Sequence, residues 1–255
     1  MKKKFSLSKF VHARPNLLCV KMRARMREIM ESLFGWSPEI IDMIKQGIVD
    51  TLYMTIVSTL LGYVIGLPAG IILAVTDKKG LRPNVVIYKI FDVVVNVIRS
   101  MPFLILLILL IPLTKFIMGK SYGASATIVP LVIAAAPFIA RMVESSLAEV
   151  DKGVIEAAES MGADTFTIIR SVLLVEARTS LVVGITIATG TILGYSAMAG
   201  VVGGGGLGDI AIRYGYYRYQ TDIMVVTIVI LVILVQLLQG IGMMLSKIID
   251  KRNIR

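Results

Sequence analysis

The sequence predicts an all-α integral membrane protein with five transmembrane helices. Hydrophobic residues make up 56% of its 255 residues, and the mean hydropathy is +0.81, far above what the core of a water-soluble domain requires. Charged residues account for only 17% and cluster between apolar runs. A helix needs about 20 apolar residues to cross about 30 Å of hydrocarbon. Five runs of suitable character occur at 47–75, 90–113, 124–140, 181–202 and 223–245.

The charge distribution divides the chain into three parts. Residues 1–29 contain nine Lys or Arg residues and one acidic residue, and so carry +8 of the net charge of +10. We therefore assign 1–46 as a basic N-terminal tail, 47–245 as the membrane domain and 246–255 as a cytoplasmic tail. Because the remaining chain is nearly neutral, it offers no broad basic surface for nucleic acid.

The five runs differ in what they are suited to contact. The first contains Pro68 and several glycines, which membrane helices tolerate when neighbouring helices satisfy the backbone. The third is short, contains Pro130 and Pro137 and is rich in alanine, so we expect it in the middle of a bundle. In the fourth, Gly190 and Gly194 have a spacing that allows close helix approach. The fifth is almost purely aliphatic and is expected to face lipid.

The second run carries a polar face. Asp92, Asn96 and Arg99 are four and seven residues apart and therefore share one side of a helix. Ionisable residues at membrane depth usually face a protein interior or a wet cavity. We favour a structural ion pair near the cytoplasmic end over a role in lining a transport pathway.

Lysines and arginines alternate along the connections between the runs. The successive connections, ending with the C-terminal tail, contain four, two, four, two and four basic residues. The positive-inside rule then places the C-terminus in the cytoplasm and, with five spans, the N-terminus outside. The basic tail contradicts this orientation. We favour an over-long open reading frame over a sixth span, because residues 1–46 contain no apolar run.

A motif lies in the third connection, at about 145–178. It reads Glu156-Ala157-Ala158, three residues, Gly162, nine residues and then Val172-Leu173-Leu174-Val175. This pattern resembles the EAA loop of bacterial ATP-binding-cassette (ABC) import permeases, which is Glu-Ala-Ala, three residues, Gly, nine residues, Ile-x-Leu-Pro. Val172 and Val175 stand where that pattern has Ile and Pro.

The residue types of this motif suit a site that receives force from another protein. The chain contains no Gly-x-x-x-x-Gly-Lys-[Ser/Thr] phosphate-binding loop and cannot itself hydrolyse ATP. Glu156 begins a helix-favouring segment, and Gly162 suits its C-terminal cap. Ala157 and Ala158 are expected to form a flat surface that a partner cleft can close on. Glu156, Ala157, Ala158 and Gly162 are therefore our candidate ATPase-coupling residues.

Four further segments, 99–103, 135–144, 194–200 and 204–208, resemble methionine-import permeases. The resemblance extends from Ile44 to the C-terminus. It implies a type I importer fold, a homodimer of five-helix subunits in the cell (inner) membrane, two ATPase subunits and an extracytoplasmic substrate-binding protein. It implies transport of methionine, as the D- or L-enantiomer or both, without a cofactor.

A candidate gate lies near the outer end of the fourth run. Met198, with Tyr195 and Ser196 beside it, is the one long apolar side chain in a segment built of small residues. A two-fold axis would bring two copies of this segment together, and methionine fills irregular gaps at low cost. The alternative is that Met198 packs against a neighbouring helix.

Other functions were weighed against the importer. Cys19 and His12 are the only residues of their types, which excludes an intrachain disulfide and leaves zinc or triad chemistry without partners. A permease for another small amino acid remains open. So do an ion-gradient-driven transporter using Asp92 and Arg99, and a structural assembly subunit.

Four tyrosines are expected to form an interfacial belt on the outer side: Tyr214, Tyr216, Tyr217 and Tyr219.

Overall fold

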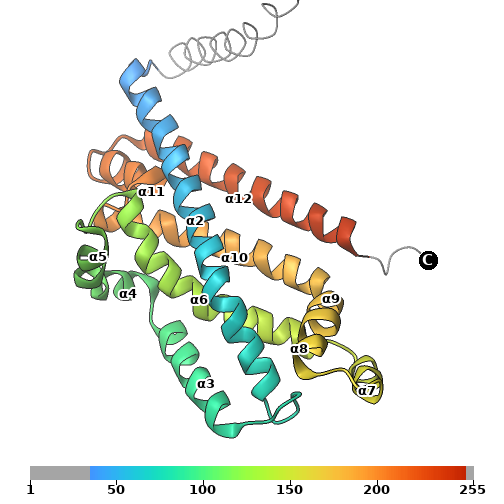
Figure 1. Cartoon of the computed structure of the whole chain (residues 1–255). Helices are drawn as coiled ribbons and strands as arrows, with labels where there is room; N and C mark the ends of the chain where they lie inside the picture. Colours follow the sequence, from blue (N-terminus) through green and yellow to red (C-terminus); the bar gives the residue numbers. More distant parts are fainter. Residues whose placement is uncertain (1–34, 251–255) are drawn as a thin grey trace, which may run out of the picture. The chain divides into compact units, whose positions relative to one another are not determined.

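The computed structural model describes residues 35–250, which form helices joined by turns with no strand among them (Figure 1). Contacts separate the chain into two units, one ending at Gln46 and the other beginning at Gly47. The basic tail, and with it the expectation about the start of the reading frame, lies mostly outside the described residues.

Four helical stretches among these residues are long and apolar enough to cross a membrane. They are α2 (Pro38–Thr76), α6 (Ala124–Ala148), the stretch Arg178–Tyr216 and α12 (Thr221–Ile249). The pair α3 (Val85–Ser100) and α4 (Phe103–Leu109) adds a fifth candidate if the two helices are counted as one bent span. The prediction of an all-helical membrane protein is confirmed, with four or five candidate spans.

The second predicted run is not one straight helix. The axes of α3 and α4 differ by 102°. Met101 between them has an extended backbone, with φ −81° and ψ 129°. A residue before proline is pushed away from helical geometry by the proline ring, and Pro102 has no N–H to continue the helix. The break therefore follows from one residue. A further helix, α5 (Ile111–Met118), ends at Gly119 in the left-handed region.

Helix α2 lies against α6 through a row of glycines. The row consists of Gly62, Gly66 and Gly70, spaced four residues apart so that they share one helix face. A Cβ on Gly66 would stand 2.7 Å from the Ala136 carbonyl oxygen, and one on Gly70 would stand 2.6 Å from the Ala140 carbonyl oxygen. The two backbones are therefore closer than any larger side chain would allow.

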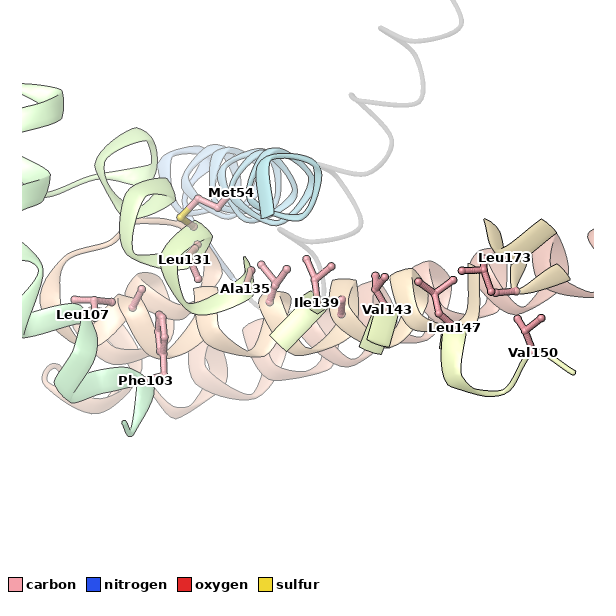
Figure 2. Packing of buried hydrophobic residues seen from close by; sticks show 14 of the residues in the cluster. Met54, Phe103, Leu107, Leu131, Ala135, Ile139, Val143, Leu147, Val150 and Leu173 are labelled. Atoms are coloured by element: carbon pink, nitrogen blue, oxygen red, sulfur yellow. The ribbon is translucent and has the colours of Figure 1, made fainter. Parts of the chain in front are cut away.

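The third run is buried among other helices, as predicted, and the fifth is exposed within the chain, while its contact with lipid stays a prediction. In α6 the most apolar window is 67% buried, whereas in α12 it is 11% buried. Helix α6 also continues beyond the predicted end at residue 140, to Ala148. Its prolines stay inside the helix. Along α6 runs the hydrophobic core, with Leu131, Ile139 and Val143 fully covered (Figure 2).

The remaining short segments lie between α6 and α10 and between α10 and α12 along the chain. After α6 come α7 (Lys152–Ser160), α8 (Thr165–Thr167), the π-helical turn η2 (Ile168–Leu173) and α9 (Leu174–Glu176). Helix α10 (Arg178–Ala199) then runs to the short elements η3 (Gly200–Val202), α11 (Gly206–Ile210) and η4 (Ala211–Tyr216). Figure 1 shows α7 and α11 near opposite ends of α10.

Candidate functional site

Helix α7 carries the Glu-Ala-Ala motif and has defined caps at both ends. At its start the Gly153 N–H donates to the Asp151 carboxylate over 2.6 Å. At its end the Gly162 N–H donates to the Glu159 carbonyl (2.9 Å), and the Ala163 N–H donates to the Ala158 carbonyl (3.1 Å). Gly162 has φ +82°. This is the Schellman arrangement, and it confirms the prediction that Gly162 ends the helix.

The motif residues do not all face the same way. Glu156 and Ala157 are exposed, and so is Gly162. Ala158 is only 5% exposed and belongs to the hydrophobic core with Leu147 and Leu173. The expectation that Ala158 presents a surface to a partner is therefore wrong. Successive residues of a helix are about 100° apart, so neighbouring alanines cannot share one face.

Sequence reasoning missed the apolar side chains that α7 and its neighbourhood expose. Val154 is exposed, Met161 is 81% exposed and Phe166 is 67% exposed. Val154 and Met161 are seven residues apart, a spacing that could have signalled a shared face. Beside them, hydrogen bonding from the Thr167 side chain lowers the pKa of the exposed Asp164 carboxyl. The surface thus combines apolar and anionic groups, as a protein-binding surface does.

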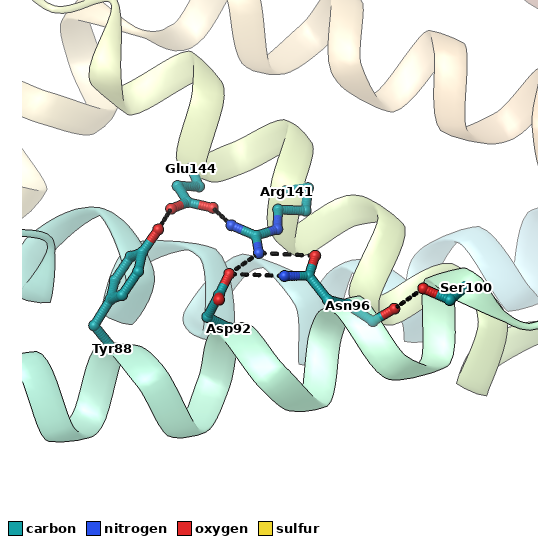
Figure 3. Close-up of polar contacts among 6 residues, drawn as sticks. All are labelled: Tyr88, Asp92, Asn96, Ser100, Arg141 and Glu144. Carbon is teal, nitrogen blue, oxygen red and sulfur yellow. Dashed lines mark hydrogen bonds and ion pairs between the residues drawn. The ribbon is translucent and has the colours of Figure 1, made fainter.

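A polar network joins α3 to α6 (Figure 3). The Arg141 guanidinium of α6 bonds to the Asp92 carboxylate and to the Asn96 side-chain oxygen (3.0 Å) of α3. It also pairs with Glu144 over 2.6 Å, and the Tyr88 hydroxyl donates to Glu144 over 3.2 Å. The expected ion pair exists, but its cation is Arg141. Arg99 is exposed.

Asp92 pairs with Arg141 instead of Arg99 for a physical reason. Helix α6 continues to Ala148, which puts Arg141 within the helix that packs beside α3 rather than in the polar connection where the sequence had placed it. One guanidinium serves two carboxylates and an amide, because its five N–H groups point outward in a fixed plane. The network therefore holds α3 against α6, and Asp92 pairs with Arg141, not with Arg99.

The three candidate gate residues have different surroundings. Met198, near the end of α10, is 52% exposed. The Tyr195 ring stacks on the Phe103 ring of α4, with centroids 4.4 Å apart and planes within 3°. Ser196 is 1% exposed and donates its hydroxyl to the Leu193 carbonyl over 2.7 Å. Of the three, only Met198 has a largely uncovered side chain, whereas Ser196 is buried in its own helix bundle.

The coupling residues and the gate residues are not brought together. Helix α10 begins at Arg178, just after the segment that carries Gly162, and Met198 lies 20 residues further along it. At 1.5 Å per residue this is about 30 Å, so helix α10 is the direct connection between the two candidate sites. Within residues 35–250, no three His, Cys, Asp or Glu side chains are placed to hold a metal ion.

Three of the four predicted belt tyrosines are exposed: Tyr216, Tyr217 and Tyr219. The Arg218 guanidinium lies 4.5 Å from the centre of the Tyr214 ring. This is an amphipathic surface at the end of η4, and its place at a membrane interface stays a prediction.

Apolar helices long enough to cross a membrane, with a short capped helix exposed between two of them, define a membrane protein that presents a surface to a partner. Residues 66–255 match the family described as the binding-protein-dependent transport system inner membrane component. The chain belongs to this family. It is an inner-membrane, multi-pass permease of the ABC transporter class, and it is not itself catalytic.

Similar proteins from several bacteria carry methionine in their names. The chain is 49% identical to a probable D-methionine transport system permease protein, MetI, of Vibrio cholerae, over 83% of this chain and 94% of the relative. It is 47% identical to the methionine import system permease protein MetP of Bacillus subtilis, over 71% of this chain and 82% of the relative.

Solved structures agree in fold. A chain of the MetNI methionine ABC transporter, determined in inward-facing conformations, superposes with a TM-score of 0.83 at 46% identity, covering 85% of this chain and all of that one. An amino acid ABC transporter with histidines matches with a TM-score of 0.68 at 21% identity, over 82% of this chain and 95% of that one. The second likeness shows the fold alone.

Proposed function

We propose that this chain is the permease subunit of an ATP-driven methionine importer and forms the pathway for methionine, as the D- or L-enantiomer or both. The observation that carries this proposal is the 49% identity to a probable D-methionine permease over 94% of that protein's length. The fold and the family support the permease role, and the relatives' names support the substrate.

The working transporter would contain two copies of this chain, two ATPase subunits and an extracytoplasmic binding protein in a lipid bilayer. We place the N-terminus outside and the C-terminus in the cytoplasm, in a type I importer arrangement. The alternation of basic residues along the connections supports this orientation. It puts α7 on the cytoplasmic side, where a separate ATPase can reach it.

Coupling would use the exposed face of α7. Glu156 and Ala157 offer a charge and a small side chain, and Met161 adds an exposed apolar group that a partner cleft can enclose. Ala158 has the opposite role, since it packs against the core that runs along α6. Movement of a docked ATPase would then pass through Ala158 into the membrane helices. Gly162 keeps the segment compact by ending α7 in a tight turn.

The pathway would be closed at the other end of α10 by Met198. An apolar side chain there, repeated in a second copy, would exclude water and ions from the path. The stacking of Tyr195 on Phe103 fixes the helix that carries Met198 against α4.

Uptake by proteoliposomes tests this function. The chain is reconstituted with the ATPase and binding protein of its own operon, and accumulation of labelled D- and L-methionine is measured with ATP inside. We expect uptake that needs ATP and all three components, and none with the permease alone. A preference for another amino acid would reject the assigned substrate, and uptake driven by an ion gradient without ATP would reject the importer mechanism.

A further inference from the structure

A turn at the end of α2 contacts the coupling segment, which is the connection of about 145–178 that carries the Glu-Ala-Ala motif. The turn joins α2 to α3 and comprises residues 77–84. In it the Arg82 Nε donates to the Thr165 side-chain oxygen over 3.0 Å, a contact between residues 83 positions apart. Thr165 is the first residue of α8, two residues after the Schellman turn that ends α7. The coupling segment therefore contacts the end of α2 as well as the helices that directly precede and follow it.

The turn is held rigidly at the end of α2. The Arg82 N–H donates to the Val75 carbonyl, and the Asn84 N–H donates to the Thr76 carbonyl, each over 3.0 Å. Gly80 lies so close to the backbone of Val75 that a Cβ would collide with it. Motion of the turn is therefore motion of α2.

The same turn is tied to the start of α3. The Asn84 side chain accepts hydrogen bonds from the Val86 and Ile87 N–H groups, each over 3.1 Å, and caps the helix. Pro83 restricts the backbone of Arg82 to extended geometry, which lowers the cost of holding the guanidinium in place. Arg82 thus belongs to a rigid turn that is hydrogen-bonded both to the end of α2 and to the start of α3.

Arg82 is not the only group of the turn that meets this region. Leu81 packs against the core cluster that includes Ala158 of α7 and Leu173 of η2. Between the turn and α7 lies an open cavity of about 710 Å³, lined from the turn by Asp77 and Lys79 and from α7 by Glu156 and Glu159. Leu81 also lines this cavity, so the side-chain hydrogen bond from Arg82 to Thr165 is the polar contact that joins the turn to the segment after α7.

We propose that Arg82 is a positioning residue for ATP coupling, which links the coupling segment through Thr165 to α2 and α3. This rests on the proposed importer function. An exposed hydrogen bond of this kind adds little to stability. Its effect is directional: when the coupling segment moves, the rigid turn moves with it, and α2 and α3 follow. Without Arg82, the ATPase would still dock and hydrolyse ATP, but movement of the coupling segment would be transmitted less completely to α2 and α3.

The test uses the complete transporter in proteoliposomes and measures ATP hydrolysed per amino acid accumulated. The variants are Arg82→Ala, Thr165→Val and the double variant, and Lys78→Ala, at an exposed position outside the cavity lining, is the control on the same turn. We expect the ratio to rise in both single variants, because less of the movement of the coupling segment reaches α2 and α3. The double variant should match the singles, and Lys78→Ala should match the wild type. A wild-type ratio in Arg82→Ala, or multiplied effects in the double variant, would overturn the proposal.

A second measurement keeps the contact testable without transport. In a chain with Cys19→Ser, the pair Arg82→Cys and Thr165→Cys should be joined by a short bifunctional maleimide in membranes, and the pair Lys79→Cys and Thr165→Cys should react less. Absence of the first cross-link in every nucleotide state would also reject the proposal. The hydrolysis ratio is measured with whichever amino acid the wild-type complex accumulates, so failure of methionine uptake rejects the substrate alone.

Discussion

The Tyr195 ring of α10 lies flat against the Phe103 ring of α4, with their centroids 4.4 Å apart. Phe103 is the first residue of α4, directly after the bend of 102° that Pro102 introduces. Tyr195 lies three residues before Met198, about one turn along α10. The stack therefore connects the broken helix to the helix end that carries the candidate gate.

Removing this stack should loosen the gate end of α10. Tyr195→Ala deletes the ring pair, which is worth about 0.5–1.5 kcal/mol beyond the buried area. We expect a lower midpoint of thermal unfolding in detergent for Tyr195→Ala, and a midpoint close to wild type for Tyr195→Phe, which keeps the ring. If both variants unfold at the same temperature, the ring stack contributes nothing to stability.

The glycine row between α2 and α6 gives a prediction about packing. Gly66→Val would force its side chain against the Ala136 carbonyl and the Ile139 side chain, which stand 2.7 and 2.8 Å from the position of a Cβ. We expect a loss of about 1–3 kcal/mol from overpacking, seen as reduced yield and a lower unfolding midpoint.

Gly240→Ala is the matched control, because a Cβ there meets nothing within 4 Å. It should leave the midpoint unchanged or raise it slightly, since alanine favours helix over glycine. A neutral Gly66→Val would mean that α2 and α6 can separate without cost.

Gly162 provides a test of the coupling segment. Its φ of +82° costs a side chain with a Cβ about 1–2 kcal/mol, and asparagine tolerates this region better than other residues. Gly162→Val should therefore reduce ATP-driven uptake strongly, whereas Gly162→Asn should retain most of it. Co-purification of the ATPase with each variant shows whether docking or coupling is lost. Equal activity of the two variants would show that the turn geometry does not matter.

Local chemistry accounts for the parts of the fold that the sequence predicts well. Apolar runs of sufficient length became helices, Gly162 ended α7, and the proline-rich third run became the buried α6. Each of these depends on neighbours within a few residues, so each can be read along the chain.

The wrong predictions concern residues whose surroundings depend on contacts between segments far apart in the sequence. Asp92 has two possible cations on the sequence, and only the continuation of α6 beyond residue 140 puts Arg141, not Arg99, beside it. Ala158 cannot be told from Ala157 by composition, yet the core covers one and not the other. The bend at Pro102 was readable from the rule for residues before proline, and the long apolar run concealed it.

The corrected ion pair makes its own prediction. Arg141→Met would leave the Asp92 and Glu144 carboxylates side by side without their shared cation, at a site where each is mostly covered. Removing one partner of a fully buried ion pair costs about 3–5 kcal/mol, and this partly exposed network should lose less than that. We expect Arg141→Met to unfold at a clearly lower temperature in detergent.

Arg99→Met removes the same charge from an exposed position and is the control. It should be close to wild type. Adding Asp92→Asn to Arg141→Met should recover part of the lost stability, because one unpaired carboxylate is then neutral. A larger effect of Arg99→Met than of Arg141→Met would restore the pairing that the sequence suggested.

Met198 has two possible roles that make different predictions, as a gate residue or as a packing residue. A fully buried methionine costs about 2–5 kcal/mol when it is replaced by alanine. Met198 is 52% exposed in its own chain, so Met198→Ala should cost the isolated subunit much less than that.

If Met198 closes the pathway with its copy in a second subunit, the alanine variant should still assemble with its partners. Its proteoliposomes should leak methionine faster than wild type without ATP, because alanine leaves a gap that the long side chain had filled. Met198→Leu, which keeps most of the apolar volume, should leak less than Met198→Ala. Passive efflux of labelled methionine from preloaded proteoliposomes measures both variants. Unchanged efflux in Met198→Ala, together with a marked loss of thermal stability, would show that Met198 packs against a neighbouring helix and does not gate.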